Sequence, residues 1–385
     1  MVFEAACEGM FIVDEDCNEL LDLYIKRNFQ KYSTESLGLT IAPTLACNFK
    51  CIYCYETSQP GIMSQEVADK IVDFVRFESD HLKNLSISWY GGEPLLAKEL
   101  LYSLSERFMA ICQEKSINYN AFIISNGSLL DDETILRLIK YQVKGIQITV
   151  DGPPEIHDCR RISKDGNKSF DLLINNINKL LLTGEIEVVL RINVDKSNDG
   201  DVERLFKILD QRLVNKNIKV TFGQVTAYTE ACRNIEHNCY DNGEFAVKLL
   251  HYHGIMSKYG FDEYNDFPYP EVKLNYCCAE LMNSFVVDHK GYLYKCWNEV
   301  GNRDRSVGNI AEGIYDITGY KNGTWLKRNP FDNEKCSNCS LLPVCMGGCP
   351  YNDLVLNKSN VCDLIKYNIK DVMIKYYEMM SNDGN

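Results

Sequence analysis

The stretch Cys47-Asn48-Phe49-Lys50-Cys51-Ile52-Tyr53-Cys54 directly follows a short apolar segment, residues 37–43, that has the composition of a β-strand. Three thiolates at this C-x3-C-x2-C spacing can hold one four-iron cluster and leave its fourth iron without a protein ligand. A cluster with four thiolate ligands can only pass electrons, whereas an open iron can also bind a small molecule. The spacing therefore favours an enzyme, with a zinc site or three unrelated thiols as the alternatives.

Composition narrows the class of protein further. The chain has 385 residues, is 45% hydrophobic and can therefore bury a core large enough for two domains. Its net charge is -13, and no basic run interleaved with aromatic residues occurs, which argues against nucleic acid as a partner. No apolar run is long enough to span a membrane, so we expect a cytoplasmic protein. In such a compartment, 17 cysteines indicate metal or cluster ligation rather than disulfides.

Short β-branched or aromatic runs alternate with longer amphipathic runs over the first half of the chain. The predicted strands are residues 37–43, 85–90, 119–125, 145–150, 187–194 and 218–222. The predicted helices between them are residues 64–78, 98–114, 131–140, 169–182 and 202–213. Strict alternation with short loops predicts an α/β fold in which six parallel strands form a partial (β/α)6 barrel.

In a parallel sheet of this kind, all loops that follow strands emerge at the same edge. The three-cysteine loop follows the first predicted strand, and the turn Gly91-Gly92-Glu93-Pro94 follows the second. Ser125-Asn126-Gly127 follows the third strand, and Asp151-Gly152 follows the fourth. We therefore expect these four loops to face one site.

The cysteine loop, including the aromatic Tyr53 before its last cysteine, closely resembles that of the radical SAM superfamily. This resemblance implies that the open iron binds S-adenosylmethionine, which is cleaved to a 5'-deoxyadenosyl radical. It also implies cofactor contacts from two adjoining loops and one strand, at Gly91, Gly92, Glu93, Ser125, Asn126 and Arg191. In this interpretation the glycines allow close backbone approach, and Glu93 receives the ammonium of the ligand.

For three of these residues the sequence leaves an alternative open. Ser125 and Asn126 can hydrogen-bond the ribose or the carboxylate of the ligand, or they can simply form a turn with Gly127. Arg191 is a cation within a β-branched run, where burial is costly unless a carboxylate pairs with it. That carboxylate can belong to the ligand or to the protein.

The C-terminal cysteines resemble the SPASM extension, which carries two auxiliary four-iron clusters in addition to the first cluster. Cys278 is followed by Gly291 and Cys296, and then by Cys336-x2-Cys339-x5-Cys345-x3-Cys349 and Cys362. The resemblance assigns Cys278, Cys296 and Cys349 to the first auxiliary cluster, and Cys336, Cys339, Cys345 and Cys362 to the second. Cys277, Cys232, Cys239 or a substrate thiolate can supply the ligand that the first auxiliary cluster still lacks. A zinc ribbon is the alternative for Cys336 to Cys349.

These patterns predict four regions. Residues 1–36 form an N-terminal segment whose helix, residues 20–29, is interpreted as the remnant of a leader-recognition module. Residues 37–222 form the radical SAM core, and residues 223–276 form a bridge with one helix, residues 244–258. Residues 277–385 form the SPASM domain, which ends in a helix at residues 364–380.

Within this superfamily, Leu39-Thr40-Ile41-Ala42-Pro43-Thr44 and Tyr55-Glu56 are most similar to enzymes that crosslink ribosomally made precursor peptides. The resemblance implies an oxidoreductase that forms thioethers from cysteine residues of such a peptide. It also implies a low-potential reductant such as flavodoxin or ferredoxin.

Two alternatives remain. Anaerobic sulfatase maturases, which make formylglycine, carry an Asp base after the second auxiliary-cluster cysteine, where this chain has Trp297. Asp288 or Glu299 would have to substitute for that base. The alternative from another class is a non-enzymatic iron-sulfur electron carrier or zinc-binding module.

Overall fold

One sheet organises the molecule. The computed structural model describes residues 17–262, 269–310, 320–358 and 361–382. Within these ranges the main sheet has nine strands in the order β11-β10-β9-β1-β3-β4-β5-β7-β8. Neighbouring strands from β9 to β8 are parallel, whereas β10 is antiparallel to β9 and β11 is antiparallel to β10. A two-stranded antiparallel ribbon, β2 with β6, lies outside this sheet.

The bounds of the elements are as follows. The strands are β1 Ser36–Ile41, β2 Phe49–Cys51, β3 Asn84–Trp89, β4 Asn118–Ser125, β5 Val143–Thr149, β6 Arg161–Ser163, β7 Glu187–Val194, β8 Ile218–Gln224, β9 Ser284–Val287, β10 Tyr292–Tyr294 and β11 Gly308–Asn309. The helices up to the bridge are α2 Glu19–Lys31, α3 Gln65–Glu78, α4 Lys98–Lys115, α5 Asp132–Lys140, α6 Pro154–Arg160, α7 Phe170–Thr183, α8 Val202–Arg212 and α9 Asn242–Lys258. The later helices are α10 Tyr320–Lys327, α11 Glu334–Ser337, α12 Leu342–Cys345, α13 Pro350–Leu354 and α14 Ile365–Asn382.

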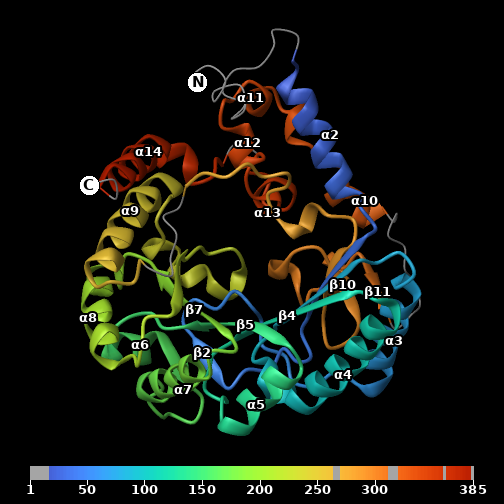
Figure 1. Cartoon of the computed structure of the whole chain (residues 1–385), viewed down its shortest axis with the longest axis horizontal. Coiled ribbons are helices and arrows are strands. Elements are labelled where there is room, and N and C mark those ends of the chain that lie inside the picture. Colours follow the sequence, from blue (N-terminus) through green and yellow to red (C-terminus); the bar gives the residue numbers. More distant parts are fainter. Residues whose placement is uncertain (1–16, 263–268, 311–319, 359–360, 383–385) are drawn as a thin grey trace.

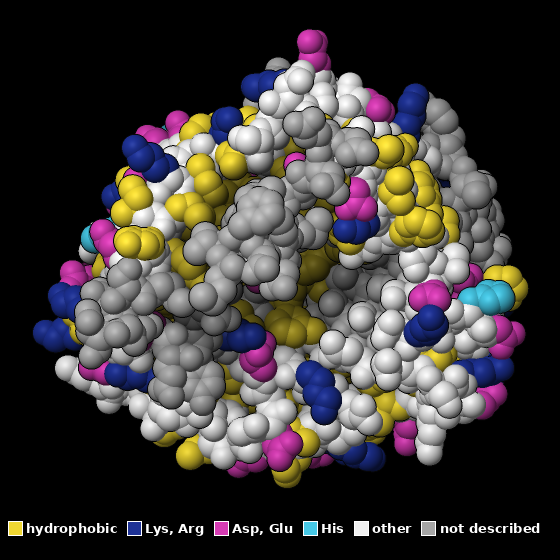
Figure 2. Space-filling model, turned by 45° about the horizontal axis from the view of Figure 1, so that its top comes forward, with side chains coloured by type: hydrophobic (Ala, Val, Ile, Leu, Met, Phe, Trp, Pro, Cys, Tyr) yellow, Lys and Arg dark blue, Asp and Glu magenta, His cyan; other side chains and the backbone are white. Residues whose placement is uncertain are grey.

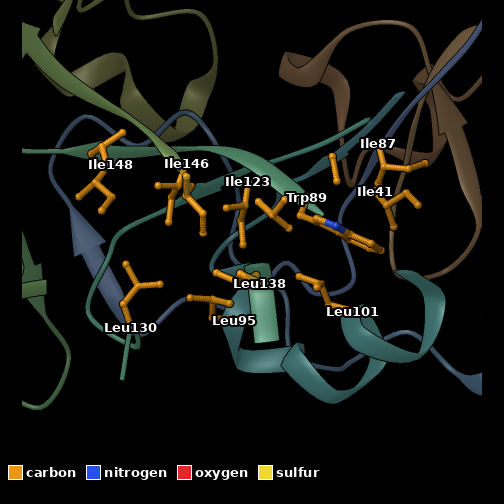
Figure 3. Packing of buried hydrophobic residues seen from close by; sticks show 14 of the residues in the cluster. Ile41, Ile87, Trp89, Leu95, Leu101, Ile123, Leu130, Leu138, Ile146 and Ile148 are labelled. Atoms are coloured by element: carbon orange, nitrogen blue, oxygen red, sulfur yellow. The ribbon is translucent and has the colours of Figure 1, made fainter. Parts of the chain in front are cut away.

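The strand-helix units form for reasons that are visible in the sequence. Ser64 caps α3 by accepting from the Val67 amide, and Asp131 caps α5 by accepting from the Thr134 amide. Apolar side chains on the helices then pack against one face of the sheet. Figure 3 shows this core, with Trp89 and Ile123 from the strands facing Leu138 from α5. Burial of such side chains stabilises the fold by about 25 cal/mol per Å² of apolar surface removed from water.

All six parallel strands expected from the sequence are present, and the helices expected between them are present too. Figure 1 shows α3 to α8 arranged in an arc around the outside of the sheet. The sheet also extends beyond the prediction, because β9 pairs in parallel with β1 and brings β10 and β11 with it. The cysteine-rich region therefore continues the sheet of the core.

Helix α9 continues this arc next to α8, and α14 packs against α9 (Figure 1). Helices α10 to α13 lie with α2 on the side across from α4 to α7 (Figure 1). Helix α2 is attached to this region through a buried ion pair between Arg27 and Glu280 (3.1 Å). In the described ranges, no helix combines the length and the apolar character that crossing a membrane requires.

Candidate functional site

The three-cysteine loop is held in place by the ribbon that follows β1. Within this ribbon Cys51 in β2 lies opposite Arg161 in β6, so the loop is tied to the segment that follows β5. Burial raises the pKa of Cys47 to about 11 and that of Cys54 to about 12. Charge on Cys51 raises both values further, and charge on Cys47 also raises that of Cys54. The three thiols therefore lie within electrostatic reach of one another.

The donor set fits an iron-sulfur cluster. In the part of the chain that is described, no three His, Cys, Asp or Glu side chains are placed to share a single metal ion. A four-iron cluster is larger than one ion, so its thiolates stand further apart. Nε of Arg161, opposite Cys51, is buried and has no hydrogen-bond acceptor among the described residues. A sulfur-rich anionic cluster held by this loop would offer that donor an acceptor.

Tyr53 connects the cysteine loop to the ends of β5 and β7. Its hydroxyl donates to Asp151 Oδ2 (2.5 Å) and accepts from Arg161 Nη1 (2.8 Å) and Asn193 Nδ2 (3.3 Å). Burial raises the pKa of Asp151, although the guanidinium groups of Arg161 and Arg160 oppose the shift. The sequence predicted that the loop of Asp151 faces the cysteine loop, but it did not predict the hydrogen bonds that Tyr53 forms with Asp151, Arg161 and Asn193.

The Gly91-Gly92 turn packs directly against the cysteine loop. A Cβ atom on Gly91 would lie 2.3 Å from the Thr44 carbonyl oxygen, and one on Gly92 would lie 2.3 Å from the Ala46 carbonyl oxygen. The Gly92 amide donates to the Thr44 carbonyl oxygen (3.2 Å). Gly91 also has a φ of +122°, which favours glycine. The glycines are thus needed where two loops meet, and their contact with a cofactor stays a prediction.

Glu93 and the loop after β4 form one hydrogen-bonded unit. The Glu93 carboxylate is fully buried and accepts from Ser125 Oγ (2.9 Å), the Asn126 amide (2.7 Å) and the Leu95 amide (3.1 Å). It therefore ties the loop after β3 to the loop after β4. Its predicted contact with a ligand ammonium, and that of Ser125 with a ribose or carboxylate, stay predictions.

Asn126 reaches the first cysteine of the loop. Its Nδ2 donates to Asn48 Oδ1 (2.7 Å) and lies 3.9 Å from Cys47 Sγ. The structure thus brings the third loop beside the first, as expected from the parallel sheet, and Asn126 is placed at the edge of the cysteine site.

Arg191 is a cation at the same edge of the sheet. Its Nε donates to Asn193 Oδ1 (3.1 Å), and among the described residues it forms no ion pair. Burial lowers its pKa, which reflects the cost of keeping the charge there. The guanidinium lies over Gly223, where a Cβ atom would be 2.2 Å from Nη2. The sequence left open which carboxylate pairs with Arg191. Among the described residues no carboxylate forms an ion pair with it, although charge on Asp151 opposes the fall in its pKa, and its contact with a ligand stays a prediction.

An aromatic cluster separates the first cysteine loop from Cys296. Trp297 packs on Tyr90 with ring centroids 4.7 Å apart, and the Tyr90 hydroxyl shares a hydrogen bond with that of Tyr55. Burial raises the pKa of the neighbouring Glu56 to about 7, although a hydrogen bond with Tyr90 opposes the shift. Figure 2 shows the molecule with the top of Figure 1 turned toward the viewer. Hydrophobic side chains are visible at the bottom of a hollow on this face (Figure 2).

The C-terminal cysteines gather in two groups. Cys277, Cys296 and Cys349 pack against the same small apolar cluster of Ala279, Trp325 and Tyr351. In the other group, burial raises the pKa of Cys336, and charges on Cys345, Cys362 and Cys339 raise it further. This interleaved grouping agrees with the predicted ligand sets, except that Cys277 takes the place beside Cys296 and Cys349. Cluster binding by these residues stays a prediction.

Two other cysteines do not join either group. Cys232 and Cys239 lie with Val225 and Ile235, next to Tyr53 and Tyr55. Cys232 Sγ lies 3.4 Å from the Thr229 carbonyl oxygen. The packing therefore offers no support for either as a ligand beside Cys296.

Comparisons with known proteins agree with this geometry. The model of the radical SAM superfamily matches residues 41–209. A cysteine-type anaerobic sulfatase-maturating enzyme of Clostridium novyi (strain NT) is 23% identical over 350 residues, which are 83% of this chain and 89% of that enzyme.

Two solved structures share the fold. Native anSMEcpe with bound AdoMet and Kp18Cys peptide has a TM-score of 0.70 at 20% identity, covering 89% of this chain and 99% of that chain. Streptococcus suis SuiB bound to precursor peptide SuiA has a TM-score of 0.60 at 16% identity, covering 91% of this chain and 81% of that chain. The matched residues contain the cysteine loop, the Gly91-Gly92 turn and Arg191. The sequence match and the shared fold together show that this chain carries a radical SAM domain.

Proposed function

We propose that this protein is a radical SAM maturase that joins a cysteine of a ribosomally made precursor peptide to a carbon atom through a thioether. The observation that carries the proposal is Trp297, which directly follows Cys296 and packs on Tyr90. In anaerobic sulfatase maturases, which this chain resembles, the residue at this position is a catalytic Asp. An indole cannot take up a proton as a carboxylate does, so formylglycine chemistry would need another base.

The structure limits what can replace that Asp. Asp288, one candidate from the sequence, accepts hydrogen bonds from the amides of Lys290 (2.8 Å) and Tyr292 (3.0 Å). It also accepts from the Tyr294 hydroxyl (2.9 Å), so both carboxylate oxygens are engaged in the β9-β10 turn. Glu299, the other candidate, is 4% exposed and lies within the 3-10 turn Trp297–Glu299.

The residues that would hold the cofactors lie at one edge of the sheet. Cys47, Cys51 and Cys54 would hold the four-iron cluster, and Arg191 would pair with the carboxylate of S-adenosylmethionine. When bound, these groups supply one-electron cleavage of the sulfonium and hence abstraction of a hydrogen atom from the peptide. The cluster of Tyr55, Tyr90 and Trp297 would exclude water from this region.

The proposed reaction balances as a two-electron oxidation. A C–H bond and an S–H bond are broken and one C–S bond forms. One electron from the reductant would cleave S-adenosylmethionine to methionine and the 5'-deoxyadenosyl radical, which would take one hydrogen atom from the peptide carbon and leave as 5'-deoxyadenosine. The thiol proton would go to solvent, and one electron would leave the site. The two C-terminal cysteine groups are suited to hold clusters that accept this electron, which gives three clusters in total.

Formylglycine formation is the second candidate, and a specific observation favours it. The chain matches 99% of anSMEcpe, a structure solved with AdoMet and a Cys-containing peptide bound, at a TM-score of 0.70. The match to SuiB bound to its precursor peptide supports the first candidate in the same way. We therefore propose a precursor peptide as partner. We also propose a low-potential reductant such as flavodoxin or ferredoxin, because cleavage of S-adenosylmethionine requires an electron.

We also propose a cytoplasmic location. All cysteines in the described ranges are free of disulfide bonds, which suits a reducing compartment.

Mass spectrometry separates the two candidates. The anaerobically reconstituted enzyme is incubated with S-adenosylmethionine, a reductant and a short Cys-containing precursor peptide. Crosslinking removes two hydrogen atoms per modified cysteine and keeps the sulfur, whereas formylglycine formation replaces the thiol by an aldehyde oxygen. A sulfatase peptide serves as the matched alternative substrate. Conversion of that peptide, without crosslinking of the precursor, would overturn the proposal.

A further inference from the structure

Two adjacent cysteines, Cys277 and Cys278, compete for one place beside Cys296 and Cys349. Resemblance in spacing assigns that place to Cys278. In the structure Cys278 is exposed to solvent, whereas Cys277 is half-buried and shares an apolar cluster with Cys296 and Cys349. Consecutive side chains point in different directions, so the backbone conformation at this point decides which thiol faces the group.

That conformation is fixed by Glu280, which is fully buried. Its Oε2 accepts from the Tyr276 amide (2.9 Å), and its own amide donates to the Cys277 carbonyl oxygen (3.2 Å). Its Oε1 accepts from Arg27 Nη2 (3.1 Å) and Arg328 Nη1 (2.9 Å). The short turn that contains both cysteines is therefore anchored to α2 and to the segment after α10.

Arg328 extends the same anchor to Cys349. Its Nη2 donates to the carbonyl oxygens of Gly347 (2.5 Å) and Gly348 (3.1 Å), just before Cys349. One buried ionic cluster thus positions both the Cys277 turn and the Cys349 loop. A rearrangement of the turn that broke these buried ion pairs would be strongly destabilising.

The thiols of Cys277, Cys296 and Cys349 also act on one another electrostatically, whereas the choice between Cys277 and Cys278 rests on their burial and packing. Burial raises the pKa of Cys296 well above its usual value, and negative charges on Glu299, Cys277 and Cys349 raise it further. Burial also raises the pKa of Cys277, to about 12, and charges on Cys278, Glu280 and Cys349 add to this effect. The three sulfur atoms therefore lie within electrostatic reach of each other.

We propose that Cys277, rather than its neighbour Cys278, joins Cys296 and Cys349 in holding the first auxiliary cluster. This inference rests on the proposed function only in assuming auxiliary clusters, and it is independent of which product forms. Three thiolates leave one corner of the cluster without a ligand from this set, and Cys278 remains a free surface thiol.

The adjacent cysteines provide a matched pair of variants in the full chain. After anaerobic reconstitution, Cys277→Ala is expected to lose about four of roughly twelve irons, together with the spectroscopic signal of one cluster. Cys278→Ala is expected to keep the iron content and the signal of the unchanged protein. Loss of a cluster from Cys278→Ala, or its retention in Cys277→Ala, would overturn the inference.

A second measurement on the unchanged holoenzyme avoids any folding defect of a variant. Brief alkylation with iodoacetamide, followed by peptide mass spectrometry, is expected to label Cys278 and spare Cys277. The reverse pattern, or protection of both thiols, would contradict the assignment. Failure of the proposed function looks different, because iron content and labelling would be as expected while no crosslinked peptide forms.

Discussion

Removing the charge of Arg191 should weaken the binding of S-adenosylmethionine. The guanidinium has only the Asn193 side chain as a hydrogen-bond partner and forms no ion pair within the described ranges. A hydrogen bond to a charged group contributes about 1.5–3 kcal/mol. Arg191→Gln should therefore raise the Kd for S-adenosylmethionine roughly 10- to 150-fold. Arg191→Lys keeps the positive charge but loses the planar guanidinium with its paired donors, so it should raise the Kd less than Arg191→Gln does.

Gly223 allows the same contact to be disturbed without touching Arg191. A Cβ atom at Gly223 would lie 2.2 Å from Nη2 and 2.4 Å from Cζ of the guanidinium. Gly223→Ala must therefore push the guanidinium aside, and it should also raise the Kd. The assay is equilibrium binding of S-adenosylmethionine to reconstituted protein, with iron content measured to show that the first cluster is intact. An unchanged Kd for Arg191→Gln at full iron content would refute this reasoning.

Three further predictions concern buried ionisable side chains. Glu280→Ala leaves Arg27 and Arg328 buried without their shared partner, so the free energy of unfolding in urea should fall by about 3–5 kcal/mol. Glu203→Ala removes an exposed ion pair as a control, and it should cost about 1 kcal/mol or less; similar losses in both variants would contradict the prediction.

Burial lowers the pKa of His157 from 6.5 to about 3. Between these two pH values the imidazole is protonated in the unfolded state and neutral in the folded state. This group should therefore lower the free energy of unfolding by about 1.4 kcal/mol between neutral pH and pH 5.5. In urea unfolding, the free energy of His157→Gln should fall by that much less than the free energy of the unchanged protein over the same pH range. Finally, Arg161→Gln removes a positive charge opposite Cys51. The midpoint potential of the first cluster, followed by electron paramagnetic resonance, should become more negative; an unchanged potential would show that Arg161 does not act on the cluster.

The strands and helices of the core were predictable because their signals are local. The caps at Ser64 and Asp131 each lie within three residues of the amide that they accept from. That the loops face one site also follows from strict strand-helix alternation, and in the structure the loop after β4 lies beside the cysteine loop, with Asn126 Nδ2 3.9 Å from Cys47 Sγ.

The remaining features depend on contacts between distant segments. In the pairing of β9 with β1, Ser284 lies opposite Gly38, and the periodicity of neither segment predicts this pairing. At Gly91 and Gly92 a side chain would meet the carbonyl oxygens of Thr44 and Ala46, a contact between two loops that the sequence did not predict; the predicted contact with a ligand stays a prediction. The direction of Cys277 depends on Glu280 and on its partners in two other segments.

The most direct test of the central claim concerns the trio Cys47, Cys51 and Cys54. The triple alanine variant and the unchanged protein are reconstituted anaerobically and given a reductant and S-adenosylmethionine. The release of 5'-deoxyadenosine is then measured by chromatography and mass spectrometry. We expect the unchanged protein to release it and the variant to release none while keeping its auxiliary iron, about eight atoms. Release by the variant at an undiminished rate would contradict the account.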